Sequence, residues 1–144
     1  IWKGPEIPDV GHGHHQADMP HAFAPHLLLG DFNTMGGSGL GPRDELDAVD
    51  AIVGAAGLIR VENATGCSQY WEGPVRSDGV FRSSLLDLVY VRGLGVAGPA
   101  RSWLHCERFQ CADLVSRTGQ EDGTFFDVSD HCPVTFEVEL DEMS

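Results

Sequence analysis

The chain has two mostly apolar runs and one run that alternates apolar and polar residues, and all three predict β-strands. The mostly apolar runs are residues 27–29 and 84–91. Short continuous apolar runs are typical of strands buried within a sheet. Residues 134–140 alternate apolar and polar side chains, which is the period of a strand, and Pro133 precedes them at a position where a strand tolerates proline. Residues 58–61 predict a further short strand.

One amphipathic helix is predicted after the first strand. Asp44 is its expected N-cap, and Gly57 supplies the C-terminal stop. Acidic residues follow Asp44 in the first turn, where the helix dipole favours negative charge. Apolar side chains recur at helical spacing between these ends, at Leu46, Val49, Val53 and Ala56. We therefore expect this segment to serve packing and to carry no site.

The remaining segments predict loops and turns. Residues 1–25 are rich in Pro, Gly and His, and we interpret them as a linker leading into the first strand. Residues 66–83 predict a long polar loop, and residues 101–118 a strand followed by a turn closed by a disulfide. The aromatic residues of the polar loop, which line a substrate cleft or pack against the sheet, are Tyr70, Trp71 and Phe81. Histidines of the linker that allow the alternative of a transition-metal site are His12, His14, His15 and His21.

Composition and charge narrow the class of protein. The chain has 144 residues, of which 42% are hydrophobic and 22% charged, as expected of one soluble globular domain. No apolar run is long enough to cross a bilayer. The net charge of −13 repels polyanions and predicts poor non-specific affinity for nucleic acid without divalent cations. A phosphoester substrate stays open, because carboxylates that bind Mg²⁺ or Ca²⁺ invert the local field.

The chain start and the cysteines bear on processing and compartment. The chain begins with neither Met nor the apolar segment of a signal peptide, so we expect a processed or truncated product of a longer chain. The four cysteines permit three complete pairings, and their spacing does not fit a zinc site. A local disulfide between Cys106 and Cys111 is the preferred pairing and implies an exported protein, whereas free buried thiols in a cytosolic protein are the alternative. The remaining cysteines are Cys67 and Cys132.

Polar residues interrupt or end the apolar strands at three places. Asp31 and Asn33 follow Gly30 on a turn and are expected to face one cavity, where a carboxylate and an amide hold a phosphate, a water or a hard metal ion. Asp87 lies inside an otherwise apolar run, so it needs a cation, a metal or a histidine as partner. The third place is the loop before the last strand, where Asp130 and His131 stand next to each other.

Together these residues resemble the motifs of the endonuclease/exonuclease/phosphatase superfamily, which has the deoxyribonuclease I-like fold. Its members carry a Gly-Asp-Phe-Asn turn, an Asp inside a late strand and a terminal Ser-Asp-His-x-Pro. This chain has them in the same order at residues 30–33, 86–91 and 129–133, and the resemblance covers about residues 26–140. It implies an α/β fold with a mostly antiparallel sheet flanked by helices, within a four-layer sandwich.

The resemblance also implies an activity, the divalent-metal-dependent hydrolysis of a phosphoester by an activated water. His131 is similar to the catalytic histidine beside the scissile phosphate, and Asp87 to the carboxylate that orients it. Asp31 and Asn33 would position the attacking water and the phosphate oxygens, so that Asn33 and His131 both contact substrate. Asp130 would help to bind the cation, Mg²⁺ or else Ca²⁺ or Mn²⁺.

The chain also departs from the family. Family domains are longer, and their N-terminal half supplies an Asn and a Glu that ligate the metal. Glu6 is the only glutamate before the Asp31 turn, and it lies in a Pro-rich stretch. Residues 26–144 therefore resemble the C-terminal half of the domain, so we expect a companion polypeptide to complete the site, or a fragment that is inactive alone. The substrate stays open between nucleic acid, phospholipid and sugar phosphate, and the alternative function is a non-catalytic module that binds a partner chain.

Overall fold

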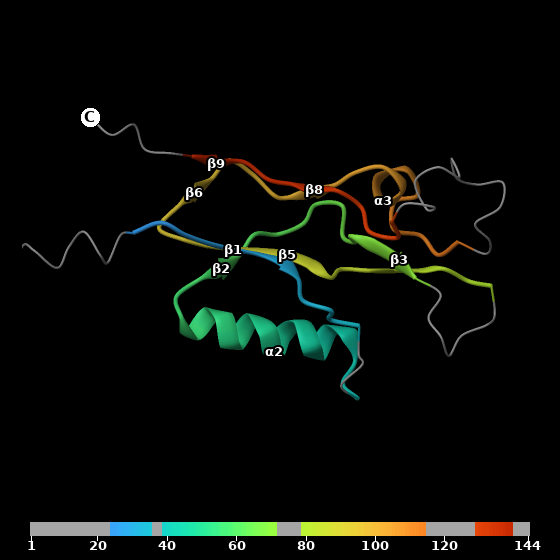
Figure 1. Cartoon of the computed structure of the whole chain (residues 1–144), viewed down its shortest axis with the longest axis horizontal. Helices are drawn as coiled ribbons and strands as arrows, with labels where there is room; N and C mark the ends of the chain where they lie inside the picture. The colour runs from blue at the N-terminus through green and yellow to red at the C-terminus, as the bar shows by residue number, and fades with distance from the viewer. Residues whose placement is uncertain (1–23, 36–38, 72–78, 115–128, 140–144) are drawn as a thin grey trace, which may run out of the picture.

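The structure is a computed structural model that describes residues 24–35, 39–71, 79–114 and 129–139 (Figure 1). Over these ranges the chain is mixed α/β, with mostly antiparallel strands and two helices, which confirms the predicted class. The histidines of the predicted linker at residues 1–25 lie outside the described residues. No helix in the described part has both the length and the apolar character to cross a bilayer.

The central sheet has three antiparallel strands in the order β1-β5-β2. They are β1 (His26–Asp31), β5 (Asp87–Arg92) and β2 (Ile59–Arg60). The pairing of β1 with β5 sets Asp31, the last residue of one strand, opposite Asp87, the first residue of the other. Asp87 thus opens its strand instead of interrupting it, and the two carboxylates lie side by side at one edge of the sheet.

The predicted helix is present as α2 (Pro42–Ala55), which lies beside the sheet in Figure 1. Its N-cap is Gly41 and not Asp44, because Pro42 takes the start of the helix, where its missing N–H costs no hydrogen bond. Asp44 lies in the first turn with Glu45, as the dipole favours. No residue of α2 is fully buried, so the helix covers the sheet loosely.

Asp50 joins α2 to the sheet. Its carboxylate accepts a hydrogen bond of 3.0 Å from Nε of Arg60 in β2 and one of 2.7 Å from the hydroxyl of Tyr90 in β5. Burial and this bond to a carboxylate raise the pKa of Tyr90 far above its usual value. The Tyr90 hydroxyl therefore stays a donor to Asp50 over the whole physiological pH range.

Residues 66–83 do not form the predicted long loop throughout. β3 (Gln69–Trp71) and β4 (Arg82–Ser84) pair as an antiparallel ladder at its ends. Gln69 and Tyr70 are buried, whereas Trp71 is 41% exposed, so burial along β3 does not alternate. The strands are too short for their period to stand out in the sequence.

The predicted strand at residues 134–140 is split in two. β8 (Val134–Thr135) pairs with β7 (Arg101–Ser102), and β9 (Val138–Glu139) pairs with β6 (Gly95–Val96). The break falls where the segment changes from one short partner to the other. The alternating pattern therefore predicted the strand character correctly and its continuity wrongly.

The strand predicted at the start of residues 101–118 is confined to β7, and it does not continue through residues 103–106. The segment forms the short helix α3 (His105–Arg108), and Leu104 before it has φ 57° and ψ −125°, a backbone conformation that side chains rarely adopt. The side chains of His105 and Cys106 are buried. Packing of these two residues therefore overrides the local preference at Leu104.

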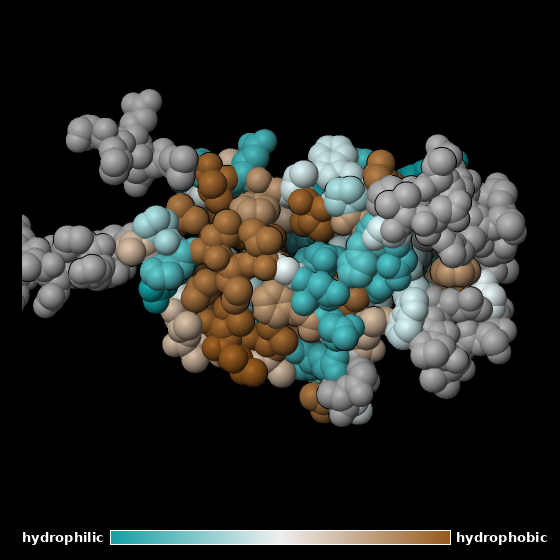
Figure 2. Space-filling view, in the orientation of Figure 1, coloured by the Kyte–Doolittle hydropathy of each residue, from teal (hydrophilic) through white to brown (hydrophobic). Residues whose placement is uncertain are grey.

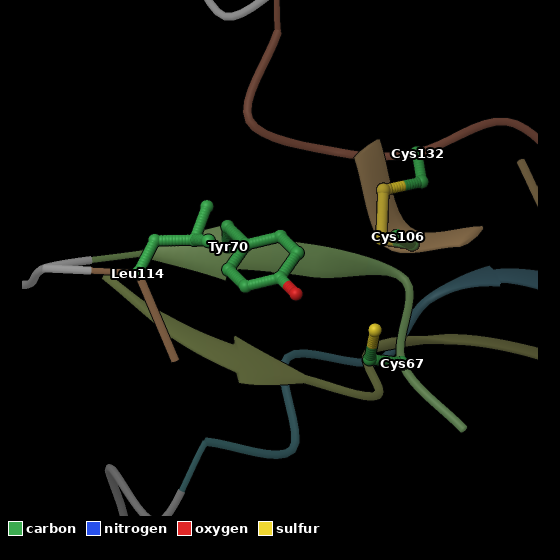
Figure 3. Close-up of a cluster of buried hydrophobic side chains, with 5 residues drawn as sticks. All are labelled: Cys67, Tyr70, Cys106, Leu114 and Cys132. Carbon is green, nitrogen blue, oxygen red and sulfur yellow. A yellow bond between two sulfur atoms is a disulfide. The ribbon is translucent and has the colours of Figure 1, made fainter. Parts of the chain in front are cut away.

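Buried side chains form two clusters. One lies between the β3–β4 ladder, α3 and the loop before β8 (Figure 3), and it consists of Cys67, Tyr70, Cys106, Leu114 and Cys132. The other lies along β5 and consists of Val61, Val89, Val91 and Ala100. The first cluster includes cysteines that form disulfides, so covalent bonds supplement a small apolar core.

Both disulfides link distant segments. Cys67 pairs with Cys111 and Cys106 with Cys132, so the preferred local pairing of Cys106 with Cys111 is wrong, as is the alternative of free thiols. The N–H of Cys111 does reach the carbonyl oxygen of Cys106 at 3.3 Å, but the two side chains leave this turn toward different partners. Two disulfides are compatible with an extracellular protein.

The apolar run of β1 is not buried as predicted. Leu27, Leu28 and Leu29 are 46%, 40% and 56% exposed. The physical reason is position, because β1 is an edge strand and both of its faces lack a full cover in the described part of the chain. Figure 2 shows apolar side chains gathered on the face over β1 and β2, where Ile59 is also exposed.

Candidate active site

The first part of the site is the pair of carboxylates at the sheet edge. Asp31 and Asp87 are direct partners in the β1–β5 ladder. Like charges that face each other across a ladder destabilise it unless a positive group lies between or beside them. This corner of the sheet therefore favours a cation.

His131 provides that group from the loop before β8. Its Nδ1 lies 2.9 Å from Oδ2 of Asp87, which is a hydrogen bond, and its Nε2 lies 3.8 Å from Oδ2 of Asp31, which is not. The N–H of His131 donates to the hydroxyl oxygen of Ser129 at 3.0 Å, so its backbone is held in a local turn. One imidazole thus faces two carboxylates, one at each nitrogen.

Ser68 fixes the backbone of Asp87. The buried hydroxyl oxygen of Ser68 accepts hydrogen bonds from the N–H of Leu86 at 3.0 Å and from the N–H of Asp87 at 2.9 Å. These hydrogen bonds hold the backbone of Asp87 next to the start of β3, and so help to position the carboxylate that contacts His131. No sequence pattern predicted this contact, because Ser68 lies in the stretch that was expected to be a loop.

β3 also holds the loop that carries Asp130 and His131. The N–H of Tyr70 donates to the carbonyl oxygen of Asp130 at 3.0 Å, and the N–H of Cys132 donates to that of Ser68 at 2.7 Å. The disulfide at Cys132 ties the same loop to α3. The strand ladder and the disulfide together set where the imidazole lies.

The turn after β1 places Asn33 next to Asp31 through its backbone. The N–H of Asn33 donates to Oδ1 of Asp31 at 2.8 Å, and Asn33 has φ 53°, a conformation that Asn tolerates better than most residues. Phe32 points away and packs edge-on against Tyr90, with ring centroids 5.5 Å apart. Both site residues are exposed, so the amide and the carboxylate lie open to solvent.

Asp130 points to a different neighbour from the other two carboxylates. Its Oδ2 accepts a hydrogen bond of 2.9 Å from Nε2 of Gln69. The structure thus brings Asp31, Asp87 and His131 into direct contact, with Asp130 attached to the same loop but held by Gln69. Sequence reasoning missed Gln69, because nothing in its local pattern marks it.

The surroundings of His131 raise its pKa. Partial burial alone would lower it, but the hydrogen bond to Asp87 and the negative charges of Asp87, Asp130 and Asp31 outweigh this effect. Because the pKa is higher in the folded chain than in the unfolded one, protonated His131 stabilises the fold at low pH. That contribution is lost as the pH rises through the folded-state pKa.

We expect an NMR titration of the His131 ring to give a pKa above the usual value of 6.5, and Asp87→Asn to lower it. The substitution removes the hydrogen-bonded charge and keeps the size of the side chain. Asp47→Asn removes the same charge from an exposed position on α2 and serves as the matched control. An unchanged His131 pKa in Asp87→Asn would contradict the electrostatic coupling.

One group of side chains among the described residues has metal-binding geometry. The donor atoms of His105, Cys106 and Cys132 lie within 4.8 Å of one another, and all three residues are buried. The two sulfurs are joined in a disulfide, so they are not thiolate ligands in this structure. Thiolates also suit soft ions and not Mg²⁺. The spacing of the cysteines had not predicted this group.

Two cavities lie along β8 or the loop before it. One of about 170 Å³ is lined by Asp87, Cys132 and apolar residues of β1 and β5, so it borders the imidazole site. A larger one, of about 910 Å³, lies beyond β7 and β8 and contains none of the predicted site residues. The small cavity is the better candidate for part of the site, because Asp87 lines it.

Comparison with known proteins identifies no relative of this chain. No family model matches the chain, and neither a curated protein nor a solved structure matches it. The functional argument therefore depends on the site itself.

Proposed function

We propose that this chain carries the His-Asp part of the active site of a divalent-metal-dependent phosphoester hydrolase. The observation that supports this best is the position of His131, which faces Asp87 at Nδ1 and Asp31 at Nε2. A carboxylate bound to one imidazole nitrogen fixes the tautomer and raises the basicity of the ring. The opposite nitrogen, at the open side near Asp31, is then left for the reaction.

Each residue has a proposed role in this reaction. His131 lies beside the scissile phosphate and holds or moves a proton at Nε2. Asp87 orients His131, and its backbone in turn is fixed by Ser68. Asp31 and Asn33, both exposed at the end of β1, position the attacking water and the phosphate oxygens.

The donor set fits a hard cation such as Mg²⁺. Such ions are bound in proteins by one or two carboxylates together with water and substrate phosphate. Asp130 is the proposed carboxylate ligand, and the ion would neutralise charge that develops on the phosphoryl group and its leaving oxygen. The buried His105, Cys106 and Cys132 are the wrong donor type for it.

We further propose that the chain is the C-terminal half of a deoxyribonuclease I-like sandwich that needs a companion half. The exposed leucines of β1 support this, because Leu27 and Leu29 share one face of the strand and a second sheet packed there would bury them. They equally favour the second candidate function, a non-catalytic module whose apolar sheet face binds a partner chain.

The charge and the disulfides favour an exported enzyme that acts on extracellular nucleic acid or another phosphoester. A chain with net charge −13 needs divalent ions to approach a polyanion. Disulfides persist in oxidising compartments.

The test is native mass spectrometry followed by hydrolysis of bis-p-nitrophenyl phosphate on the same sample. We expect a companion polypeptide and turnover that EDTA abolishes and added Mg²⁺ or Mn²⁺ restores, because the ion is part of the reaction. Turnover that resists EDTA would contradict the metal dependence. A companion without turnover in any metal would favour the binding module.

A further inference from the structure

We infer that Gln69 is a positioning residue of this site, because its side-chain amide fixes the carboxylate of Asp130. The contact stands on geometry alone. Its consequence for cation binding depends on the proposed function, in which Asp130 is the ligand. No motif in the sequence points to Gln69.

Gln69 lies at the point where β3 meets the loop before β8. Its Nε2 donates to Oδ2 of Asp130 at 2.9 Å, and its backbone forms an isolated antiparallel bridge with His131. The residue is only 6% exposed, so solvent competes little for this hydrogen bond. One buried side chain thus spans the gap between β3 and the residue next to the imidazole.

The backbone around Gln69 is held on both sides. The N–H of Ser68 donates to the carbonyl oxygen of Ser84 at 2.8 Å on the β4 side, and the N–H of Tyr70 donates to that of Asp130 at 3.0 Å on the loop side. The amide therefore projects from a fixed base. A hydrogen bond from such a base keeps the Asp130 carboxylate in one orientation. Outer partners of metal ligands act on those ligands in the same way.

The carbonyl oxygen of the Gln69 side chain indicates that the amide is oriented toward Asp130. Oε1 of Gln69 is buried and has no hydrogen-bond partner among the described residues. Turning the amide over would set Oε1 against the carboxylate, so only the observed orientation is favourable. A buried carbonyl without a partner costs stability, and an apolar side chain of equal length avoids this cost.

The experiment uses Gln69→Met, which keeps the length and removes both polar atoms, and Asp130→Asn, singly and together. We expect Gln69→Met to weaken Mn²⁺ binding by about tenfold, the lower end of the effect of losing an outer partner of a metal ligand. In the Asp130→Asn background the same change has no further effect on the remaining affinity. Thermal unfolding of Gln69→Met is measured alongside, so that Mn²⁺ affinities are compared between folded proteins. Gln110→Met, at an exposed position, is the matched control.

A second measurement leaves Gln69 intact. The Nε2 proton resonances of Gln69 are expected downfield and slow to exchange, and Asp130→Asn shifts them upfield. Unchanged resonances would overturn the contact, and equal Mn²⁺ affinity in Gln69→Met would overturn the positioning role. Equal losses with and without the Asp130 carboxylate would show a merely structural role. An unsubstituted chain that does not bind Mn²⁺ would overturn the cation role of Asp130 in the proposed function, while the resonances still judge the contact.

Discussion

Asp87→Asn is expected to lower the turnover of a phosphodiester by about 10²–10⁴-fold, the range that general acid–base groups contribute, with little change in KM. Asp87 bonds Nδ1 of His131 at 2.9 Å and lies on the far side of the ring from the proposed substrate. The amide presents either an N–H or a neutral oxygen to Nδ1. The first stabilises the wrong tautomer, and the second leaves Nε2 less basic.

The pair should act as a unit. If Asp87 works only through His131, then His131→Ala lowers turnover at least as much as Asp87→Asn, and the double variant is no worse than His131→Ala alone. Additive losses would mean that the two residues contribute separately, and an equal rise in KM would mean that Asp87 binds substrate.

The measurement is kcat and KM in the assembly that carries turnover, at several pH values. Asp44→Asn, in the exposed first turn of α2, removes the same charge away from the site and is the control. Because Asp87 raises the pKa of His131, the pH profile of Asp87→Asn also moves toward lower pH. A loss of turnover with no change in the profile would contradict the assigned contact.

The contact at the centre of this prediction was accessible from the sequence. A carboxylate inside an otherwise apolar run needs a partner, and the resemblance of residues 129–133 to a family motif pointed to His131. The side-by-side position of Asp31 and Asp87 depends on the β1–β5 register, which sets the end of β1 opposite the start of β5. Single-sequence patterns do not fix such a register, so the exact pairing required the structure.

The supports of the site were not accessible. Ser68 and Gln69 act through contacts to residues far along the chain, and a two- or three-residue strand has too few positions to show a period. The prediction of the disulfide pairing failed for a related reason, because the pairing depends on where α3 and the loop before β8 lie in space. Burial of β1 was overestimated. An apolar run shows that a strand is suited to packing against other elements, but it does not show that the described part of the chain supplies them.

Loss of either disulfide is expected to lower the free energy of unfolding by about 3–4 kcal/mol, since each closes a loop of some tens of residues. The separations are 44 residues for Cys67–Cys111 and 26 for Cys106–Cys132. Small domains are stable by only about 5–15 kcal/mol, so either loss is a large share of the total. The core they lie in is small, and few other buried side chains compensate.

The two disulfides differ in what else they hold. Cys132 directly follows His131, whereas Cys67 and Cys111 join the segment before β3 to the turn after α3. We compare the double variants Cys106→Ala/Cys132→Ala and Cys67→Ala/Cys111→Ala by urea unfolding and by the ring resonances of His131. Both should unfold at lower urea, but only the first should also move the His131 resonances under native conditions, because only it frees the loop. Equal resonances in the two variants would mean that the β3 hydrogen bonds position the imidazole without the disulfide.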